Sequence, residues 1–104
     1  MSYKIVMVSS FYKDANEIFF YISQRLGAQQ AAEGLLEQVY QKAKKLADSP
    51  ALGRVFILTD GTKTEFRRIN VRNYSMFYYV NEEKHTIEIR RLIYSRRNLE
   101  LILK

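Results

Sequence analysis

The stretch AEGLLEQVYQKAKKLADSPALGRVFIL, residues 32–58, decides the fold because its hydrophobic period changes within it. Before Ser49, apolar residues recur at the spacing of one helical face; they are Ala32, Leu35, Leu36, Val39, Tyr40, Ala43, Leu46 and Ala47. Because Pro50 cannot continue a helix, this helix is predicted to end before Ser49-Pro50. Val55 to Leu58 is an apolar run typical of a short strand or an extended arm.

Upstream of this stretch, the sequence predicts a strand and another helix. Tyr3 to Val8 is rich in β-branched and aromatic residues, and Ser9 or Ser10 supplies a helix cap. The following apolar residues again share one helical face; they are Phe11, Ala15, Ile18, Phe19, Ile22 and Leu26. Gly27 is predicted to end this helix. Two amphipathic helices joined so tightly form an antiparallel hairpin.

Downstream of Pro50 the pattern stays strand-like for about forty residues, which predicts an antiparallel sheet. The predicted features are the turn pair Asp60-Gly61 and strands at Phe66 to Val71, Met76 to Val80 and Thr86 to Tyr94. In the last strand, alternation places Ile87, Ile89 and Ile93 under the helices, and Glu88, Arg90, Leu92 and Tyr94 on the other face. The fold class is therefore α+β, with the order β-α-α-β-β-β.

Composition limits the classes of protein that this chain can belong to. Its 104 residues, 47% of them hydrophobic, suit one domain spanning 1–104. No apolar run approaches the roughly 20 residues of a membrane helix, and no charged leader precedes Ser9, so we expect a cytoplasmic protein without a membrane partner. With no cysteine and the single His85 in a predicted turn, we expect neither a metal site nor a cofactor.

The charge favours polyanionic or strongly acidic partners. The net charge is +6, and residues 53–104 contribute +5 of it together with eight of the nine arginines. Arginine offers a planar fork that matches phosphate or carboxylate. The candidate residues are Arg67, Arg68, Arg72, Arg90, Arg91, Arg96 and Arg97, with Tyr74, Tyr78, Tyr79 and Tyr94 interleaved as stacking platforms. A solvated, charged sheet face is the simpler alternative. No glycine-rich phosphate loop, nucleophile elbow or spaced carboxylate pair is present.

The order of elements and several short motifs resemble the RelE/ParE superfamily of bacterial toxins from type II toxin-antitoxin systems. The resemblance runs from Tyr3 to about Arg97 and is carried by the segments Ser49–Arg54, Phe66–Tyr74, Phe77–Val80 and Ile89–Asn98. It implies a helical hairpin packed on a twisted antiparallel sheet. The tail is closer to the ParE-like, plasmid-stabilisation branch, although Tyr94, Ser95 and Asn98 replace a histidine, a glycine and an aspartate of that pattern.

The superfamily covers two activities that share one fold, so site residues must decide between them. RelE-like members cut messenger RNA in the ribosome, and ParE-like members poison DNA gyrase. For a metal-independent endoribonuclease, or mRNA interferase, the resemblance implies that Arg68 and Arg97 stabilise the scissile phosphate while Tyr94 assists proton transfer. Asn70 and Ser75 stand where RNA-cutting members carry further basic residues.

We therefore favour a ParE-like toxin that inhibits growth by binding DNA gyrase. The predicted target- or nucleic-acid-binding residues are Arg67, Arg68, Arg72, Arg90, Tyr94, Arg96 and Arg97, followed by the tail Ser95 to Lys104. The alternatives are a ribosome-dependent nuclease acting on mRNA, and an inactive family member that only binds antitoxin. In each case the family implies a cognate antitoxin, and the charge of this chain predicts an acidic one.

Overall fold

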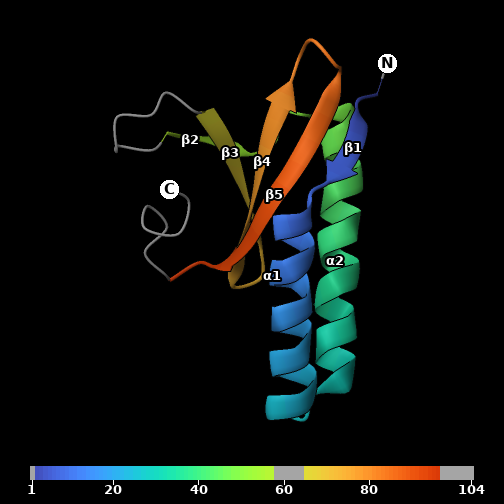
Figure 1. Cartoon of the computed structure of the whole chain (residues 1–104), viewed down its shortest axis with the longest axis vertical. Helices are drawn as coiled ribbons and strands as arrows, with labels where there is room; N and C mark the ends of the chain where they lie inside the picture. The colour runs from blue at the N-terminus through green and yellow to red at the C-terminus, as the bar shows by residue number, and fades with distance from the viewer. Residues whose placement is uncertain (1, 58–64, 97–104) are drawn as a thin grey trace.

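The computed structural model describes residues 2–57 and 65–96, and within them it has two layers, a helical hairpin and a sheet (Figure 1). The elements are β1 (Lys4–Met7), α1 (Ser9–Phe20), the π-helix η1 (Tyr21–Arg25), α2 (Gln29–Asp48), β2 (Arg54–Ile57), β3 (Glu65–Val71), β4 (Tyr74–Asn81) and β5 (Thr86–Tyr94). The predicted α+β order is confirmed, and β5 has the predicted bounds. The predicted turn at Asp60-Gly61 lies outside the described residues.

The sheet has five strands in the order β1-β5-β4-β3-β2. The pairs after Pro50, namely β2–β3, β3–β4 and β4–β5, are antiparallel as predicted. Strand β1 joins the edge of β5 in parallel, with Lys4 opposite Thr86 and Met7 opposite Ile89. No tight turn has to join these two strands, because the helical hairpin and strands β2 to β4 lie between them in the chain.

The helical hairpin turns at Gly27, whose φ of 63° lies in the left-handed region that favours glycine. Before it, α1 passes into the π-helix η1, which changes the helical phase by adding residues to a turn. Phe11 and Ala15 are fully buried, Ile18 and Ile22 pack partly against the core, and Leu26 is 59% exposed. The predicted apolar stripe was therefore wrong at Leu26, where the π-helix has rotated the face away.

The core lies between the helices and one side of the sheet, which we call the helix face. Its buried members include Phe11, Leu35, Val39 and Leu46 from the helices and Ile69, Met76, Tyr78, Ile87, Ile89 and Leu92 from the sheet. The opposite side, the far face, carries the alternate residues Phe66, Arg68 and Asn70 of β3 and Ser75, Phe77 and Tyr79 of β4. Among the described residues, no helix is long and apolar enough to cross a membrane.

A bulge in β5 reverses the predicted alternation. Ile89 pairs with Tyr78 and Arg91 pairs with Phe77, so Arg90 is the extra residue. Beyond it, Leu92 pairs with Met76 and joins the core, whereas Ile93 pairs with Ser75 on the far face. The predicted faces of Leu92 and Ile93 were therefore wrong, because alternation holds only while a strand stays in register.

Asp14 fastens α1 to β5 immediately after this bulge. Its carboxylate accepts hydrogen bonds from Arg91 Nε at 2.7 Å, from Arg91 Nη2 at 3.0 Å and from the Leu92 backbone N–H at 2.9 Å. Hydrogen bonding to Asp14 raises the pKa of the Arg91 guanidinium, so this guanidinium stays charged. The strand β1 pairs with β5 only as far as Ile89, so the Leu92 N–H at this edge has no partner in β1 and is satisfied by Asp14 instead. The contact thereby fixes the end of β5.

Candidate functional site

The far face carries a polar network centred on a fully buried hydroxyl, that of Ser75. Arg68 Nε donates to Ser75 Oγ at 3.0 Å, and Ser75 Oγ donates to Asn70 Oδ1 at 3.1 Å. The Ser95 hydroxyl lies 2.9 Å from the same oxygen. Ser75 and Asn70 face each other across β3 and β4, so the strand register itself assembles the network. Its effect is to hold one edge of the Arg68 guanidinium in a fixed position.

Arg54 on β2 lies directly opposite Arg68 on β3. Two like charges in this relation destabilise a sheet unless an anion or water lies between them. The two arginines border a hollow of about 430 Å³ that is also lined by Leu52, Gly53, Ile69 and Asn70. The described lining contains no carboxylate. The arrangement therefore suits a phosphate or a carboxylate that bridges the two guanidinium groups.

Tyr78 fixes the loop that carries Arg54 to this hollow. From the helix face, its hydroxyl donates to the Pro50 carbonyl at 2.8 Å and accepts from the Gly53 N–H at 2.9 Å. Arg67 Nη1 donates to the Gly53 carbonyl at 2.8 Å. Burial raises the pKa of Tyr78, so the phenol stays protonated and keeps donating. The backbone just before Arg54 is thereby held against β3 and β4.

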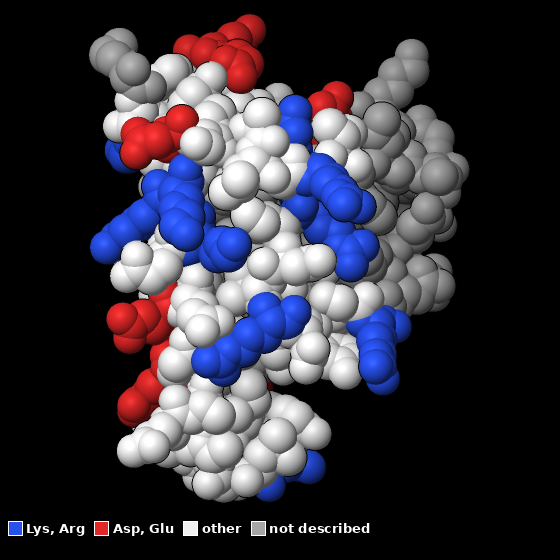
Figure 2. Space-filling model, turned by 180° about the vertical axis from the view of Figure 1, so that it is seen from behind, with Lys and Arg blue, Asp and Glu red and all other residues white. Residues whose placement is uncertain are grey.

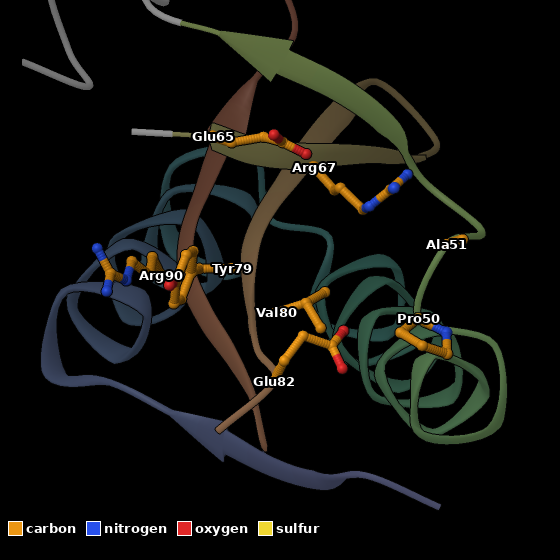
Figure 3. Close-up of a pocket in the computed structure, with 8 residues that line it drawn as sticks. All are labelled: Pro50, Ala51, Glu65, Arg67, Tyr79, Val80, Glu82 and Arg90. Carbon is orange, nitrogen blue, oxygen red and sulfur yellow. The ribbon is translucent and has the colours of Figure 1, made fainter. Parts of the chain in front are cut away.

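A larger hollow of about 750 Å³ lies at the other end of these strands (Figure 3). Arg90 lies beside Tyr79 there, with its guanidinium carbon 5.2 Å from that ring centre and 5.8 Å from the ring centre of Phe66. Arg90 also pairs with Glu88 at 2.8 Å. Because the carboxylates of Glu65 and Glu82 line the same hollow, it is less suited to a polyanion than the Arg54–Arg68 hollow.

The remaining predicted residues do not meet at one site. Arg72 lies in the turn after β3, and its Nε donates to Gln38 on α2 at 3.0 Å. Tyr94 pairs with Tyr74 on the helix face, and their ring centres are 5.7 Å apart. Arg96 is exposed in the turn after β5, whereas Arg97 lies outside the described residues.

Tyr94 is therefore separated from Arg68 by the sheet. It borders a hollow on the α1 side together with Asp14, Ile18 and Tyr21, among others. The prediction that Tyr94 shares a face with Arg90 was wrong, because the bulge at Arg90 turns Tyr94 towards α1. Burial, with smaller contributions from Tyr94 and Tyr21, raises the pKa of the neighbouring Tyr74, so its phenol stays protonated at neutral pH.

His85 lies in the predicted turn between β4 and β5, but its ring is not simply solvated. It stacks on Tyr3 with ring centres 3.9 Å apart, and its Nε2 is buried without a hydrogen-bond partner among the described residues. This position is remote from the Arg54–Arg68 hollow, which none of the turn residues lines.

The structure adds two residues that the sequence analysis did not select as site residues. Arg54 enters through its register opposite Arg68, and Ser75 enters through the hydrogen bond that it accepts from Arg68. The sequence pointed to Arg54 only through the motif Ser49–Arg54, to which it belongs. Local sequence does not indicate that the strand of Arg54 pairs with the strand of Arg68. Figure 2 shows the wider setting, with Lys and Arg spread across the middle of one face and Asp and Glu at its upper and left margins.

Comparison with known proteins gives a family and a fold. The family model described as the ParE toxin of the type II toxin-antitoxin system parDE matches residues 5–99. No curated protein sequence matches the chain. Among solved structures, a mutant of the E. coli toxin RelE in the free state superposes with a TM-score of 0.66 at 15% identity, covering 98% of this chain and 93% of that one.

A second solved structure is similar over nearly its full length. It is the toxin-antitoxin complex RelBE2 from Mycobacterium tuberculosis, with a TM-score of 0.56, 15% identity, and coverage of 90% of this chain and 99% of that one. At 15% identity the two structures establish only that the fold is shared. Family membership rests on the match of the sequence to the family model. Because that model spans β1 to the end of β5, the chain belongs to the ParE toxin family of type II toxin-antitoxin systems.

Proposed function

We propose that this toxin arrests growth by binding DNA gyrase and not by cutting messenger RNA. The observation that carries the proposal is the separation of Arg68 from Tyr94 by the sheet. Cleavage of RNA needs an acid or base within hydrogen-bond reach of the scissile phosphate. Among the described residues that line the Arg54–Arg68 hollow, none is a carboxylate, an imidazole or a phenol. The hollow has the chemistry of a binding site.

Arg54 and Arg68 then serve as the anion-binding pair of the toxin. Arg68 is held by Ser75 through Nε, which leaves the other guanidinium nitrogens for a ligand. Their ligand is a DNA phosphate or an acidic side chain in the gyrase–DNA complex. Ser95 of the same network begins the tail that we assign to target contact, and the exposed Arg96 follows it. Such a target places the protein in the cytoplasm.

A ribosome-dependent nuclease remains the second candidate because one feature favours it. The guanidinium of Arg68 is fixed at a hollow that fits a phosphate, as transition-state stabilisation would need. In that mechanism Arg97 is the second stabiliser, and a group outside the described residues moves the proton. The third candidate is a member that has lost toxicity and only binds antitoxin.

We further propose that the partner of this toxin is an acidic antitoxin. The net charge of +6 favours an acidic segment by charge complementarity. The fold resembles that of a toxin solved together with its antitoxin. Coexpression with the product of the neighbouring gene and purification through one tagged partner tests this directly.

The experiment that separates the candidates measures which synthesis fails first. Labelled thymidine and labelled methionine are followed in bacteria during the minutes after the chain is induced alone. The proposal expects thymidine incorporation to fall first, whereas a nuclease stops methionine incorporation first. If neither falls, the chain is an inactive family member.

Purified components then test the residues. Gyrase supercoiling is measured with the wild type, with Arg54→Gln/Arg68→Gln and with the charge-matched control Lys13→Gln/Lys44→Gln. The first variant is expected to lose inhibition and the control to retain it. Retention of full inhibition by Arg54→Gln/Arg68→Gln contradicts the assigned site. Removing a charge that stabilises the transition state lowers the rate about a hundredfold. A loss of mRNA cleavage of that size in Arg68→Ala therefore supports the nuclease instead.

A further inference from the structure

A second basic hollow lies beside α2, and we call it the α2 groove. It has a volume of about 360 Å³ and is lined by Gln38, Gln41, Lys42 and Lys45 of α2 and by Asn70, Val71 and Arg72 of β3 and its turn. Three lining residues are cationic, three are amides, and no carboxylate is among the described lining. Neither lysine forms an ion pair with a described residue. The groove is built to receive negative charge.

Two of the three acidic residues of α2 lie far around the helix from Lys42. At about 100° per residue, Glu33 lies about 180° and Glu37 about 140° around the helix from Lys42. Lys44 lies on the same flank as these two glutamates and is absent from the groove. The third acid of α2, Asp48, lies about 60° around the helix from Lys45, at the C-terminal end, and is absent from the described lining of the groove. The charged residues that line the groove are therefore all cationic.

Arg72 is held over the groove by an unusual backbone. Its φ of 54° lies in the left-handed region, which costs a residue other than glycine roughly 1 kcal/mol or more. The guanidinium of Arg72 lies against α2, where its Nε donates to Gln38. Its Nη2 is so close to Gly34 that a Cβ atom added there would lie 3.3 Å from it. A pre-positioned guanidinium loses less rotamer entropy on binding than a free one.

The lining favours a peptide over a nucleic acid. Side-chain amides pair with the peptide backbone as donor and acceptor together, and Gln38, Gln41 and Asn70 line the groove with the cations. No aromatic ring is among the described lining, so a single-stranded nucleic acid would have no surface on which to stack its bases. Asn70 also lines the Arg54–Arg68 hollow, so one acidic chain can run from the groove into that hollow.

We propose that the α2 groove binds an acidic peptide segment, namely a Glu- or Asp-rich stretch of the antitoxin. This inference rests on the acidic antitoxin proposed above and adds where its negative charge docks. Occupation of the groove also brings that segment next to Arg68, so the antitoxin masks the target-binding arginines from one side.

The test uses a fluorescently labelled peptide of alternating Glu and Ser, titrated with the purified chain. Binding is measured by anisotropy for the wild type, for Lys42→Gln/Lys45→Gln and for Lys13→Gln/Lys44→Gln. The last variant loses the same charge from residues outside the groove. We expect the groove variant to bind about tenfold more weakly and the control variant less than about twofold more weakly. Equal unfolding temperatures of the three proteins exclude misfolding as the cause.

Three results overturn the proposal. Equal weakening in both variants means that only the net charge matters, and no weakening in either means that the peptide binds elsewhere. Tighter, groove-dependent binding of an oligothymidylate or oligouridylate of the same charge means that the groove takes nucleic acid. Because the titration needs no growth arrest, failure of the gyrase proposal leaves this result intact. Failure of the antitoxin proposal is seen separately, as the absence of a copurifying partner.

Discussion

Replacing Gly53 by alanine tests how closely the loop before β2 is packed. A Cβ atom at this position lies 2.7 Å from the Tyr78 hydroxyl, 2.9 Å from Tyr78 Cε1 and 2.9 Å from the Arg68 carbonyl oxygen. All three distances are below any normal Cβ contact. Two of the atoms belong to a fully buried ring and the third to the backbone of β3, so none moves without disturbing the sheet. Gly53 has no left-handed φ, so the problem is one of space.

The expected loss of stability is about 3 kcal/mol. Overpacking a closed site costs about 1–3 kcal/mol. Relieving it moves the loop away and weakens two hydrogen bonds, from the Gly53 N–H to Tyr78 and from Arg67 to the Gly53 carbonyl, at about 0.5–1.5 kcal/mol each. The assay is urea unfolding followed by far-ultraviolet circular dichroism, with the free energy of unfolding compared between variants.

A double-mutant cycle isolates the cause. Tyr78→Phe removes the hydroxyl that Cβ approaches most closely, so Gly53→Ala is expected to cost about 1 kcal/mol less in that background. If Gly53→Ala changes stability by less than about 0.5 kcal/mol, or if the cycle shows no coupling, the packing argument for this loop is refuted.

Three further predictions concern a helix, the far-face network and pH. Gly34→Ala places Cβ 3.3 Å from only the flexible end of Arg72, so the gain in helix propensity is expected to raise stability by about 0.5–1 kcal/mol; a drop in unfolding temperature contradicts this. Ser75→Ala removes the buried acceptor of Arg68 and is expected to cost about 2–3 kcal/mol in urea unfolding, a loss that Ser75→Thr with its retained hydroxyl should reduce. Burial raises the pKa of Tyr78 above the ordinary value of 10.0, so the unfolded chain releases this proton first and stability should decline as pH rises past that value. Urea unfolding across alkaline pH measures the stability, and phenolate absorbance recorded in parallel measures the ionisation of Tyr78. A stability that does not change with pH, together with ionisation of Tyr78 at its ordinary pKa, disproves this prediction.

Local sequence pattern predicted the helices and the later strands, but it did not predict which arginines lie together. The helix that ends before Ser49-Pro50 and the strand Thr86–Tyr94 have the expected bounds. The spacing of apolar residues that distinguishes a helix from a strand repeats within a few neighbouring residues, so local sequence is enough to predict both. Arg68 was predicted as a site residue, and it borders the hollow with Arg54. Arg72 and Tyr94 were expected with it but lie on the helix side, and Arg97 lies outside the described residues.

Residue order and composition along the chain account for the helical hairpin, the antiparallel strands after Pro50 and the C-terminal excess of arginine. Tertiary packing, in contrast, determines which arginines lie together. The bulge at Arg90 turned Tyr94 to the helix face, and strand register placed Arg54 opposite Arg68. Register and bulges depend on how one strand packs against another far away in sequence, so neighbouring residues do not specify them.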